Sequence, residues 1–234
     1  GERIVGTVHH SDYPPVARFI PRVGGYDNLD LERIVALEPD LVIAWKSGNT
    51  PGEVARLERL GLPVYYSEPR TLDDIARALE RLGELAGTAE RARAAAQEFR
   101  AHRRVLERRY AGRPPVSVFY QIWHSPLMTV NGEHVISDVI RLCGGRNVFA
   151  DLSSLSPTVS IEAVLAADPE AVVASGMGEE RPEWLDEWRG WPGLAAVEHG
   201  NLFFIPPDLL QRHGPRILQG AERLCRRLER ARGE

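Results

Sequence analysis

The sequence lacks an apolar stretch long enough to cross a membrane. A bilayer span needs roughly 20 consecutive apolar residues, whereas the longest candidates, residues 41–45 and 171–174, have the length of strands. A Met start, a basic leader and a hydrophobic leader are also missing, because the chain opens with Gly1-Glu2-Arg3. We therefore expect a processed or trimmed product that contains no membrane-spanning helix.

An excess of positive charge is missing too. The chain has 29 Lys and Arg against 33 Asp and Glu, a net charge of -4, and a pI near 6.0. Proteins that neutralise a phosphate backbone need basic surfaces. Nucleic acid is therefore not expected as a partner.

Catalytic signatures are absent as well. The sequence has no Walker loop, no G-x-S-x-G elbow, no H-E-x-x-H motif and no G-x-G-x-x-G turn after a strand. His9 and His10 would face opposite sides of an extended segment, which argues against a shared metal site there. A metal-dependent enzyme using His9, His10, His124 and His213 stays open as an alternative, although no pair has ligand spacing and no nucleophile lies beside a base.

Alternating strand and helix patterns predict an α/β chain with parallel sheets. The first part predicts strands at 3–8, 41–45 and 63–66 and helices at 31–37 and 51–60. Helical periodicity alone fills residues 71–113, with one long helix from Ala89 to Tyr110 ended by Pro114-Pro115. The last part predicts strands at 116–121, 171–175 and 202–205, helices at 137–142 and 161–166, and an amphipathic terminal helix from Pro215. We therefore expect an N-terminal lobe (1–70), a helical linker (71–113) and a C-terminal lobe (114–234).

A weak internal repeat favours two similar lobes. Residues 31–44 resemble residues 161–174, and the offset from Glu32 to Glu162 equals the offset from Pro39 to Pro169. Each copy predicts a short helix, a proline-marked turn and a buried strand. Because this order is common in α/β proteins, the repeat alone does not decide the question.

Aromatic residues gather where the predicted strands end. Tyr26 precedes the first repeat helix, Trp45 ends its strand, and Trp123 and His124 follow the strand at 116–121. Ligands of α/β proteins commonly bind beyond the carboxyl ends of strands, so these side chains are candidates for an aromatic-lined cleft. Lone aromatics more often belong to a core or a rim. We interpret the three tryptophans between 184 and 191 as a surface helix outside the site.

Cys143 and Cys225 are the only cysteines. Their separation excludes a CxxC redox motif. A disulfide in an oxidising compartment and two buried free thiols are both compatible with the residues themselves.

Several segments resemble the periplasmic cobalamin-binding proteins of ABC importers. The matching stretches are His10-Ser11-Asp12-Tyr13-Pro14-Pro15, residues 31–45, Leu142-Cys143-Gly144-Gly145, Val159-Ser160-Ile161-Glu162, residues 208–212 with Pro215-Arg216, and Leu224-Cys225. The wider family of helical-backbone solute-binding proteins also binds haem, ferric siderophores and metal chelates. The resemblance implies two Rossmann-like lobes joined by a single long α-helix, with the ligand in a cleft between the lobes.

The resemblance also implies a set of ligand-binding residues. By position these are His10, where the family often has tyrosine, Tyr26, where it often has tryptophan, and Trp45, Asp208 and Arg212; Trp123 joins them as an aromatic at a strand end. Ser156 stands where relatives carry a tryptophan, which weakens that wall of the cleft. The family's first strand and its polar loop would precede residue 1, so we expect an incomplete first lobe and an altered ligand site.

The leading hypothesis is a non-catalytic receptor that captures cobalamin or a related corrinoid. It would deliver this ligand to an inner-membrane ABC permease dimer, act as a monomer in the periplasm or another extracytoplasmic space, and use no cofactor, since cobalamin is the transported ligand. Membrane anchoring before trimming stays open. Within the same fold, haem, a ferric siderophore or a metal chelate is the alternative ligand, with His10, Tyr26 or His213 as metal ligands.

Two further features follow from the resemblance alone. Related proteins pair cysteines at the positions of Cys143 and Cys225, which predicts a disulfide. They also present one glutamate per lobe to arginines of a two-fold permease, which predicts docking through Glu32 and Glu162. A carboxylate near the start of a helix also stabilises the helix, so stability alone is the competing explanation for both glutamates.

Overall fold

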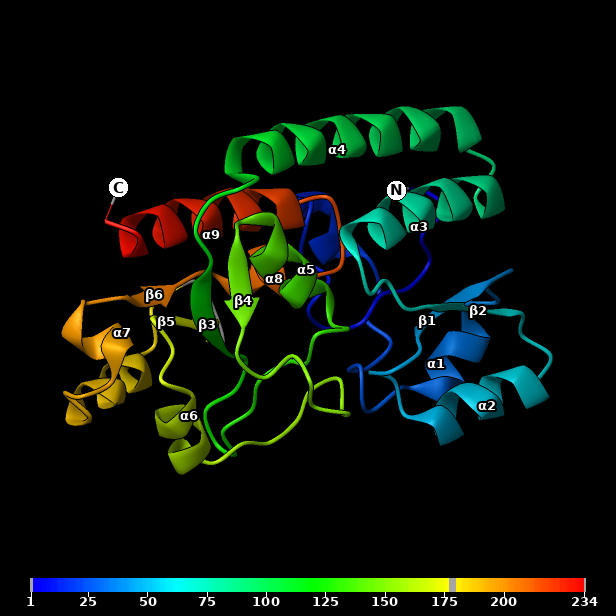
Figure 1. Ribbon diagram of the computed structural model, residues 1–234. Helices are drawn as coiled ribbons and strands as arrows, with labels where there is room; N and C mark the ends of the chain where they lie inside the picture. The colour runs from blue at the N-terminus through cyan, green and yellow to red at the C-terminus, as the bar shows by residue number, and fades with distance from the viewer. Residues whose placement is uncertain (1, 177–179, 234) are drawn as a thin grey trace. The chain divides into compact units, whose positions relative to one another are not determined.

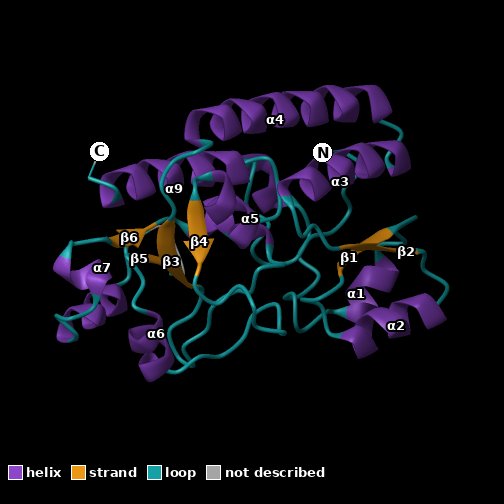
Figure 2. Ribbon diagram, viewed as in Figure 1, coloured by secondary structure: helices purple, strands orange, loops and turns teal. Residues whose placement is uncertain are grey.

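The computed structural model describes residues 2–176 and 180–233. It divides the chain into two compact units, Gly1–Glu68 and Pro69–Glu234, which we call unit 1 and unit 2. No helix of the described residues is both long and apolar enough to cross a membrane. Each unit has its own parallel sheet (Figure 2).

Unit 1 contains a two-stranded parallel sheet and three short helices. Its elements are η1 (Pro15–Phe19), α1 (Leu31–Ala36), β1 (Val42–Trp45), α2 (Pro51–Arg59) and β2 (Val64–Ser67). Strand β1 pairs with β2 in a register that sets Val42 opposite Val64 and Trp45 opposite Ser67. The core of this unit is small and centres on Val23, Ile34 and Leu57.

The strand predicted for residues 3–8 is wrong. Only Thr7 forms a parallel bridge there, with Arg22. The Arg22 guanidinium donates to the Thr7 hydroxyl at 2.6 Å and to the backbone carbonyls of Val8 and Ser11 at 3.1 and 2.9 Å. The backbone of Thr7 bonds to Pro21 and Val23, and the Arg22 side chain occupies the Val8 carbonyl, so the segment makes a single bridge in place of a ladder.

Unit 2 is built on a four-stranded parallel sheet in the order β4-β3-β5-β6. The strands are β3 (Val116–Gln121), β4 (Gly145–Asn147), β5 (Ala171–Ala174) and β6 (Leu202–Phe204). The helices are α3 (Leu72–Leu85), α4 (Ala89–Tyr110), α5 (Val135–Leu142), α6 (Ile161–Ala167), η2 (Glu183–Gly190), α7 (Ala195–Glu198), α8 (Pro207–Leu210) and α9 (Ile217–Ala231). The predicted long helix from Ala89 to Tyr110 is confirmed.

Helices cover both faces of this sheet (Figure 1). Successive side chains of a strand point to opposite faces. Accordingly, Val118 and Tyr120 pack with residues of α3, α4, α5 and α9, whereas Phe119 packs with residues of α6, η2 and α7. The fully buried strands β3 and β5 thus lie at the centre of a three-layer α/β unit.

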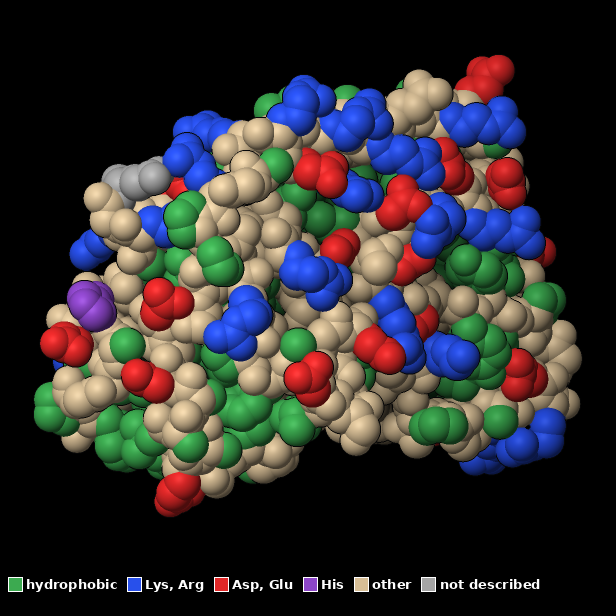
Figure 3. Space-filling view, in the orientation of Figure 1, with side chains coloured by type: hydrophobic (Ala, Val, Ile, Leu, Met, Phe, Trp, Pro, Cys, Tyr) green, Lys and Arg blue, Asp and Glu red, His purple; other side chains and the backbone are tan. Residues whose placement is uncertain are grey.

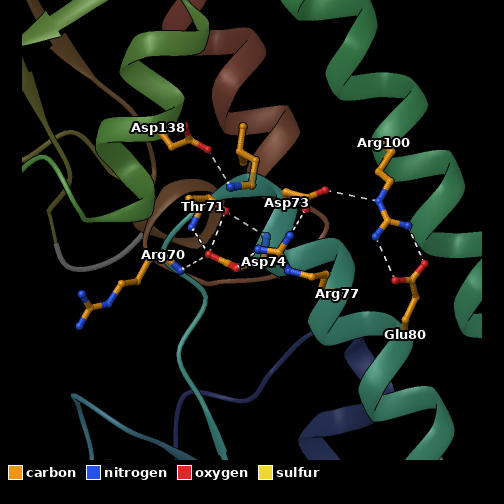
Figure 4. Close-up of polar contacts among 9 residues, drawn as sticks. Arg70, Thr71, Asp73, Asp74, Arg77, Glu80, Arg100 and Asp138 are labelled. Atoms are coloured by element: carbon orange, nitrogen blue, oxygen red, sulfur yellow. Dashed lines mark hydrogen bonds and ion pairs between the residues drawn. The ribbon is translucent and has the colours of Figure 1, made fainter.

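Helices α3 and α4 are cross-linked by charge. The Arg100 guanidinium of α4 contacts both carboxylate oxygens of Glu80 in α3, at 2.5 and 2.9 Å, and Asp73 at 3.5 Å (Figure 4). On the face drawn in Figure 3, basic and acidic side chains are interspersed over these helices. The arrangement favours local ion pairs over a continuous basic surface.

The start of α3 is fixed by a capping box. The Thr71 hydroxyl accepts from the backbone N–H of Asp74, and the Asp74 carboxylate accepts from the backbone N–H of Thr71 at 2.8 Å. Burial raises the pKa of Asp74, but hydrogen bonds from Thr71, Arg77 and Arg70 together outweigh it, so this pKa lies below its ordinary value. The carboxylate of Asp138, from α5, accepts the backbone N–H of Leu72 at 2.8 Å.

The internal repeat is visible in the backbone. Asp30 caps α1 and Ser160 caps α6 by accepting a backbone N–H three residues later. Both repeat helices are followed by a residue in the left-handed region, Glu38 at φ 45° and Asp168 at φ 39°, just before the proline. The strands differ, however: β5 is buried, whereas Ile43 of β1 is 54% exposed, so the buried strand predicted for the first copy is wrong.

A disulfide joins Cys143, at the end of α5, to Cys225 in α9, and confirms the predicted pair.

The tryptophans between 184 and 191 do not form the predicted surface helix. They lie in and beside the 3-10 helix η2, and Trp188 is buried against Phe119 with 5.6 Å between ring centroids. The Trp188 indole N–H donates to the buried Gln121 side chain at 2.8 Å, so a polar partner makes its burial possible.

Candidate functional site

Unit 1 brings two predicted ligand-binding residues together. Trp45 ends β1, Tyr26 lies in the preceding loop, and their ring centroids are 6.3 Å apart with planes tilted by 53°. Tyr26 is 50% exposed and Trp45 is 40% exposed. The two rings thus form an aromatic corner at the carboxyl end of a parallel strand, where α/β proteins commonly bind ligands.

Residues 48–50 hold this aromatic corner in place. The Asn49 side chain accepts from the backbone N–H of Trp45 at 2.6 Å and donates to the Tyr26 carbonyl at 2.7 Å. The Thr50 hydroxyl donates to the Asp27 carbonyl at 3.1 Å. Sequence reasoning missed these residues, although a Gly-Asn pair shortly after a strand is a recognisable turn signal.

His10 lies in an exposed turn of unit 1. The adjacent His9 donates its backbone N–H to the Gly24 carbonyl at 3.0 Å, which places this turn beside the loop that carries Tyr26. Within residues 2–176 and 180–233, no ring contact joins His10 to Tyr26 or Trp45. His10 remains a predicted ligand residue.

The predicted residues of unit 2 follow the ends of its strands. Asp208 lies in α8, directly after β6, and forms ion pairs with Arg212 at 2.8 Å and with Arg216 at 3.5 Å. Trp123 follows β3, is 41% exposed, and donates its indole N–H to the Ser125 carbonyl at 2.9 Å. Asp208 and Arg212 are therefore brought together, and both lie on the same edge of the sheet as Trp123.

Buried hydrogen bonds tie these strand ends to one another. The Tyr120 hydroxyl donates to the Ser175 hydroxyl at 2.7 Å, which donates to the Ile205 carbonyl at 2.8 Å. Burial raises the pKa of Tyr120 strongly, and the phenol therefore stays protonated as a donor. These hydrogen bonds connect the ends of β3, β5 and β6 to one another. Sequence reasoning did not find them.

The histidines of the enzyme alternative have other partners. The His124 ring stacks on Trp184 with 5.2 Å between centroids, and the His213 ring meets His134 at 5.7 Å. The described part of the chain contains no group of three side chains arranged to hold a metal ion.

The two predicted docking glutamates occupy matching positions. Glu32 and Glu162 are each the second residue of a capped helix, α1 and α6. The interaction with its own backbone N–H, followed by that with the Ser160 hydroxyl, lowers the pKa of Glu162 from its ordinary value. Glu32 borders an open cavity of about 930 Å³ between α1 and α2, lined by aliphatic side chains such as Leu31 and Val35 and by charged ones such as Glu53 and Arg56.

Exposed aromatic and polar side chains at strand ends, on two α/β units, are typical of a ligand-binding protein. Residues 1–209 match the family model described as periplasmic binding protein, and the chain belongs to this family. Its relatives are binding proteins of transport systems, so the chain is a binding protein and not an enzyme.

Curated relatives match over nearly the whole chain. The vitamin B12-binding protein of Vibrio cholerae serotype O1 is 38% identical over 226 residues, which are 96% of this chain and 81% of that protein. The vitamin B12-binding protein of Photorhabdus laumondii is 37% identical over 229 residues, 97% of this chain and 81% of that protein.

Solved structures of the same fold are similar as well. The periplasmic vitamin B12-binding protein of Vibrio cholerae has a TM-score of 0.88 and 36% identity, covering 98% of this chain and 89% of that chain. A periplasmic haem-binding protein of Pseudomonas aeruginosa has a TM-score of 0.81 and 26% identity, covering 94% of this chain and 83% of that chain.

Proposed function

We propose that this protein binds cobalamin or a related corrinoid outside the cytoplasm and delivers it to an ABC transporter. The observation that carries the proposal is the 38% identity, over 96% of the chain, to a vitamin B12-binding protein. The TM-score of 0.88 to a vitamin B12-binding structure supports the same ligand. The similarity to a haem-binding protein is lower at 26% identity, so haem is the second candidate.

The physical form of a corrin suits the ligand residues that the resemblance implies. A corrin ring is broad and flat, with apolar faces and amide side arms, and aromatic rings with a few polar groups suit such a surface. Tyr26 and Trp45 would contact an apolar face, whereas Asp208 and Arg212 would hydrogen-bond amide arms. His10 and Trp123 complete the proposed set.

Titration calorimetry with three separate ligands tests this proposal. We expect heat on adding cyanocobalamin, and none on adding haemin or a ferric hydroxamate siderophore. A matched variant, Trp45→Ala, should weaken the cyanocobalamin signal, whereas Val105→Ala, at an exposed position of α4, should not. A clear haemin signal without a cyanocobalamin signal would overturn the choice of ligand.

We also propose that a monomer docks on a two-fold permease through Glu32 and Glu162. The matching caps and matching second positions of α1 and α6 support equivalent contacts with two identical subunits. Exposed charges of this kind mainly set docking register and encounter rate.

A further inference from the structure

In unit 1, the Asn49 side chain forms hydrogen bonds through both its amide oxygen and its amide nitrogen. Its oxygen accepts the backbone N–H of Trp45 at 2.6 Å, and its nitrogen donates to the backbone carbonyl of Tyr26 at 2.7 Å. One amide thus joins the end of β1 to the loop that carries the second ring. We propose that Asn49, together with Gly48, is a positioning residue that fixes the angle between Tyr26 and Trp45 for ligand binding.

Gly48 contributes by lacking a side chain. A Cβ built on Gly48 would lie 1.9 Å from Cε3, 2.2 Å from Cζ3 and 2.3 Å from Cδ2 of the Trp45 indole. Real atoms do not approach this closely, so any side chain would displace the ring. Gly48 is not in the left-handed region, so the close approach of the indole, rather than the backbone conformation, requires glycine here.

A turn-forming role explains only half of these contacts. Asparagine side chains commonly accept a nearby backbone N–H in tight turns, and an aspartate can do the same. The hydrogen bond from the Asn49 nitrogen to the Tyr26 carbonyl needs a donor, which aspartate lacks. Asn49→Asp therefore keeps the acceptor for Trp45, removes the link to Tyr26 and adds a negative charge, which Asn28→Asp also adds in the loop of Tyr26.

The consequence for binding rests on the proposed function. Tyr26 and Trp45 expose apolar surface, and a flat ligand can contact both rings only at a suitable angle between them. A side chain that holds this angle in the free protein removes part of the ordering cost that binding would otherwise carry. Asn49 then determines affinity without touching the ligand.

The free protein provides the first test. The difference in near-ultraviolet circular dichroism between wild type and Trp45→Phe isolates the signal of the Trp45 indole. We expect Asn49→Asp and Gly48→Ala to lose this signal. The controls Asn28→Asp, in the same loop as Tyr26, and Gly52→Ala, where a Cβ meets open space, should retain it. Retention of the signal in Asn49→Asp would overturn the positioning role.

Calorimetry with cyanocobalamin provides the second test. We expect Asn49→Asp to weaken binding about tenfold, and Asn28→Asp to change it less than about twofold. In a Tyr26→Ala, Trp45→Ala background, Asn49→Asp should cost less than about twofold, because its effect acts through the two rings. An equal loss in both backgrounds would contradict the proposal.

The two proposals fail separately. If wild type gives no heat with cyanocobalamin, the proposed function fails, while the dichroism comparison still decides whether Asn49 and Gly48 fix the rings. If wild type binds cyanocobalamin and Asn49→Asp binds equally well, the positioning role fails and the proposed function stands.

Discussion

The imidazole of His213 meets that of His134 edge-on, with 5.7 Å between ring centroids and 72° between planes. His134 is 6% exposed and caps the start of α5, where its Nδ1 accepts the backbone N–H of Ile136 at 3.1 Å. Burial, and then the charge of His213, lowers the pKa of His134 to about 3. A neutral cap of α5 therefore faces a second titratable ring.

This lowered pKa predicts a loss of stability in acid. In the unfolded chain the ordinary pKa is about 6.5, so between that value and about 3 the unfolded state binds a proton that the folded state does not. Stability from this group is complete above pH 6.5 and falls as pH decreases, by about 1.4 kcal/mol per unit.

Replacement of His134 by asparagine tests the assignment. His134→Asn keeps a side-chain acceptor at the helix start but cannot titrate. We expect urea unfolding of this variant between pH 6.5 and 4.5 to show a weaker pH dependence than wild type. His199→Asn, at an exposed histidine, is the control and should keep the wild-type slope. Equal slopes in all three proteins would refute the assignment to His134.

Glu38 and Asp168 should respond differently to glycine. Both occupy the left-handed region, where glycine is less strained, so Glu38→Gly should stabilise the protein by roughly 0.5–1 kcal/mol. The Asp168 carboxylate also accepts the backbone N–H of Ala195 at 2.9 Å, and Asp168→Gly loses this bond. Thermal unfolding should show a gain for Glu38→Gly and none for Asp168→Gly. A gain of equal size in both would show that the Asp168 hydrogen bond contributes nothing.

The Arg100 cross-link should contribute more than an exposed ion pair. Arg100 and Glu80 are 28% and 30% exposed and share two hydrogen bonds, whereas the Arg81–Glu84 pair is 56% and 47% exposed. Arg100→Met should therefore lower the free energy of unfolding by about 1 kcal/mol, and Arg81→Met by less than about 0.5 kcal/mol. Urea titrations of the two variants measure the difference; equal effects would mean that solvent screens both pairs alike.

The disulfide should stabilise unit 2 through the length of the loop that it closes. Cys143 and Cys225 are 82 positions apart, and the chain-entropy model gives about 4 to 5 kcal/mol for such a loop. We expect a reducing agent to lower the unfolding temperature of wild type but not that of the double variant Cys143→Ala, Cys225→Ala. Insensitivity of wild type to complete reduction, verified by thiol titration, would contradict this expectation.

Removal of both predicted docking carboxylates should separate transport from binding. Glu32→Ala with Glu162→Ala is expected to retain cyanocobalamin affinity and fold while losing transporter-dependent uptake in cells. Glu98→Ala with Glu107→Ala removes the same charge from exposed positions of α4 and is the control. Unchanged uptake would leave these glutamates with a role in helix stability only, and lost ligand binding would place them on the ligand side.

Helices and strands with a clear hydrophobic period were predictable from the sequence. Hydrogen bonds between residues distant in the sequence were not. Helix α4 and strand β3 begin and end where the sequence predicts, and Pro114-Pro115 separate them. The segment at 3–8 has strand-like residues, but its backbone forms only the bridge at Thr7, and the Arg22 side chain occupies the Val8 carbonyl. No local pattern reveals these contacts. Similarly, the tryptophans between 184 and 191 resembled a surface helix in the sequence. The contact of Trp188 with the buried Gln121 joins residues far apart in the chain, so no local pattern reveals it.

The candidate site shows the same division. Trp45 was proposed because it ends a recognisable strand, and Tyr26 because an aromatic precedes a helix. Asn49 was missed because its importance comes from a hydrogen bond to a residue 23 positions away. A turn signal indicates local backbone geometry, but it does not tell which distant carbonyl the side chain reaches.

The small core of unit 1 implies uneven backbone protection against hydrogen exchange. Its core cluster centres on Val23, Ile34 and Leu57, whereas the larger clusters of unit 2 run through both faces of a four-stranded sheet. Local openings with few buried apolar contacts cost the least free energy. Amides of β1 and β2 should therefore exchange through openings that leave β3 and β5 protected, and a ligand held by Tyr26 and Trp45 would slow exchange most in unit 1, the part of the chain that opens most readily.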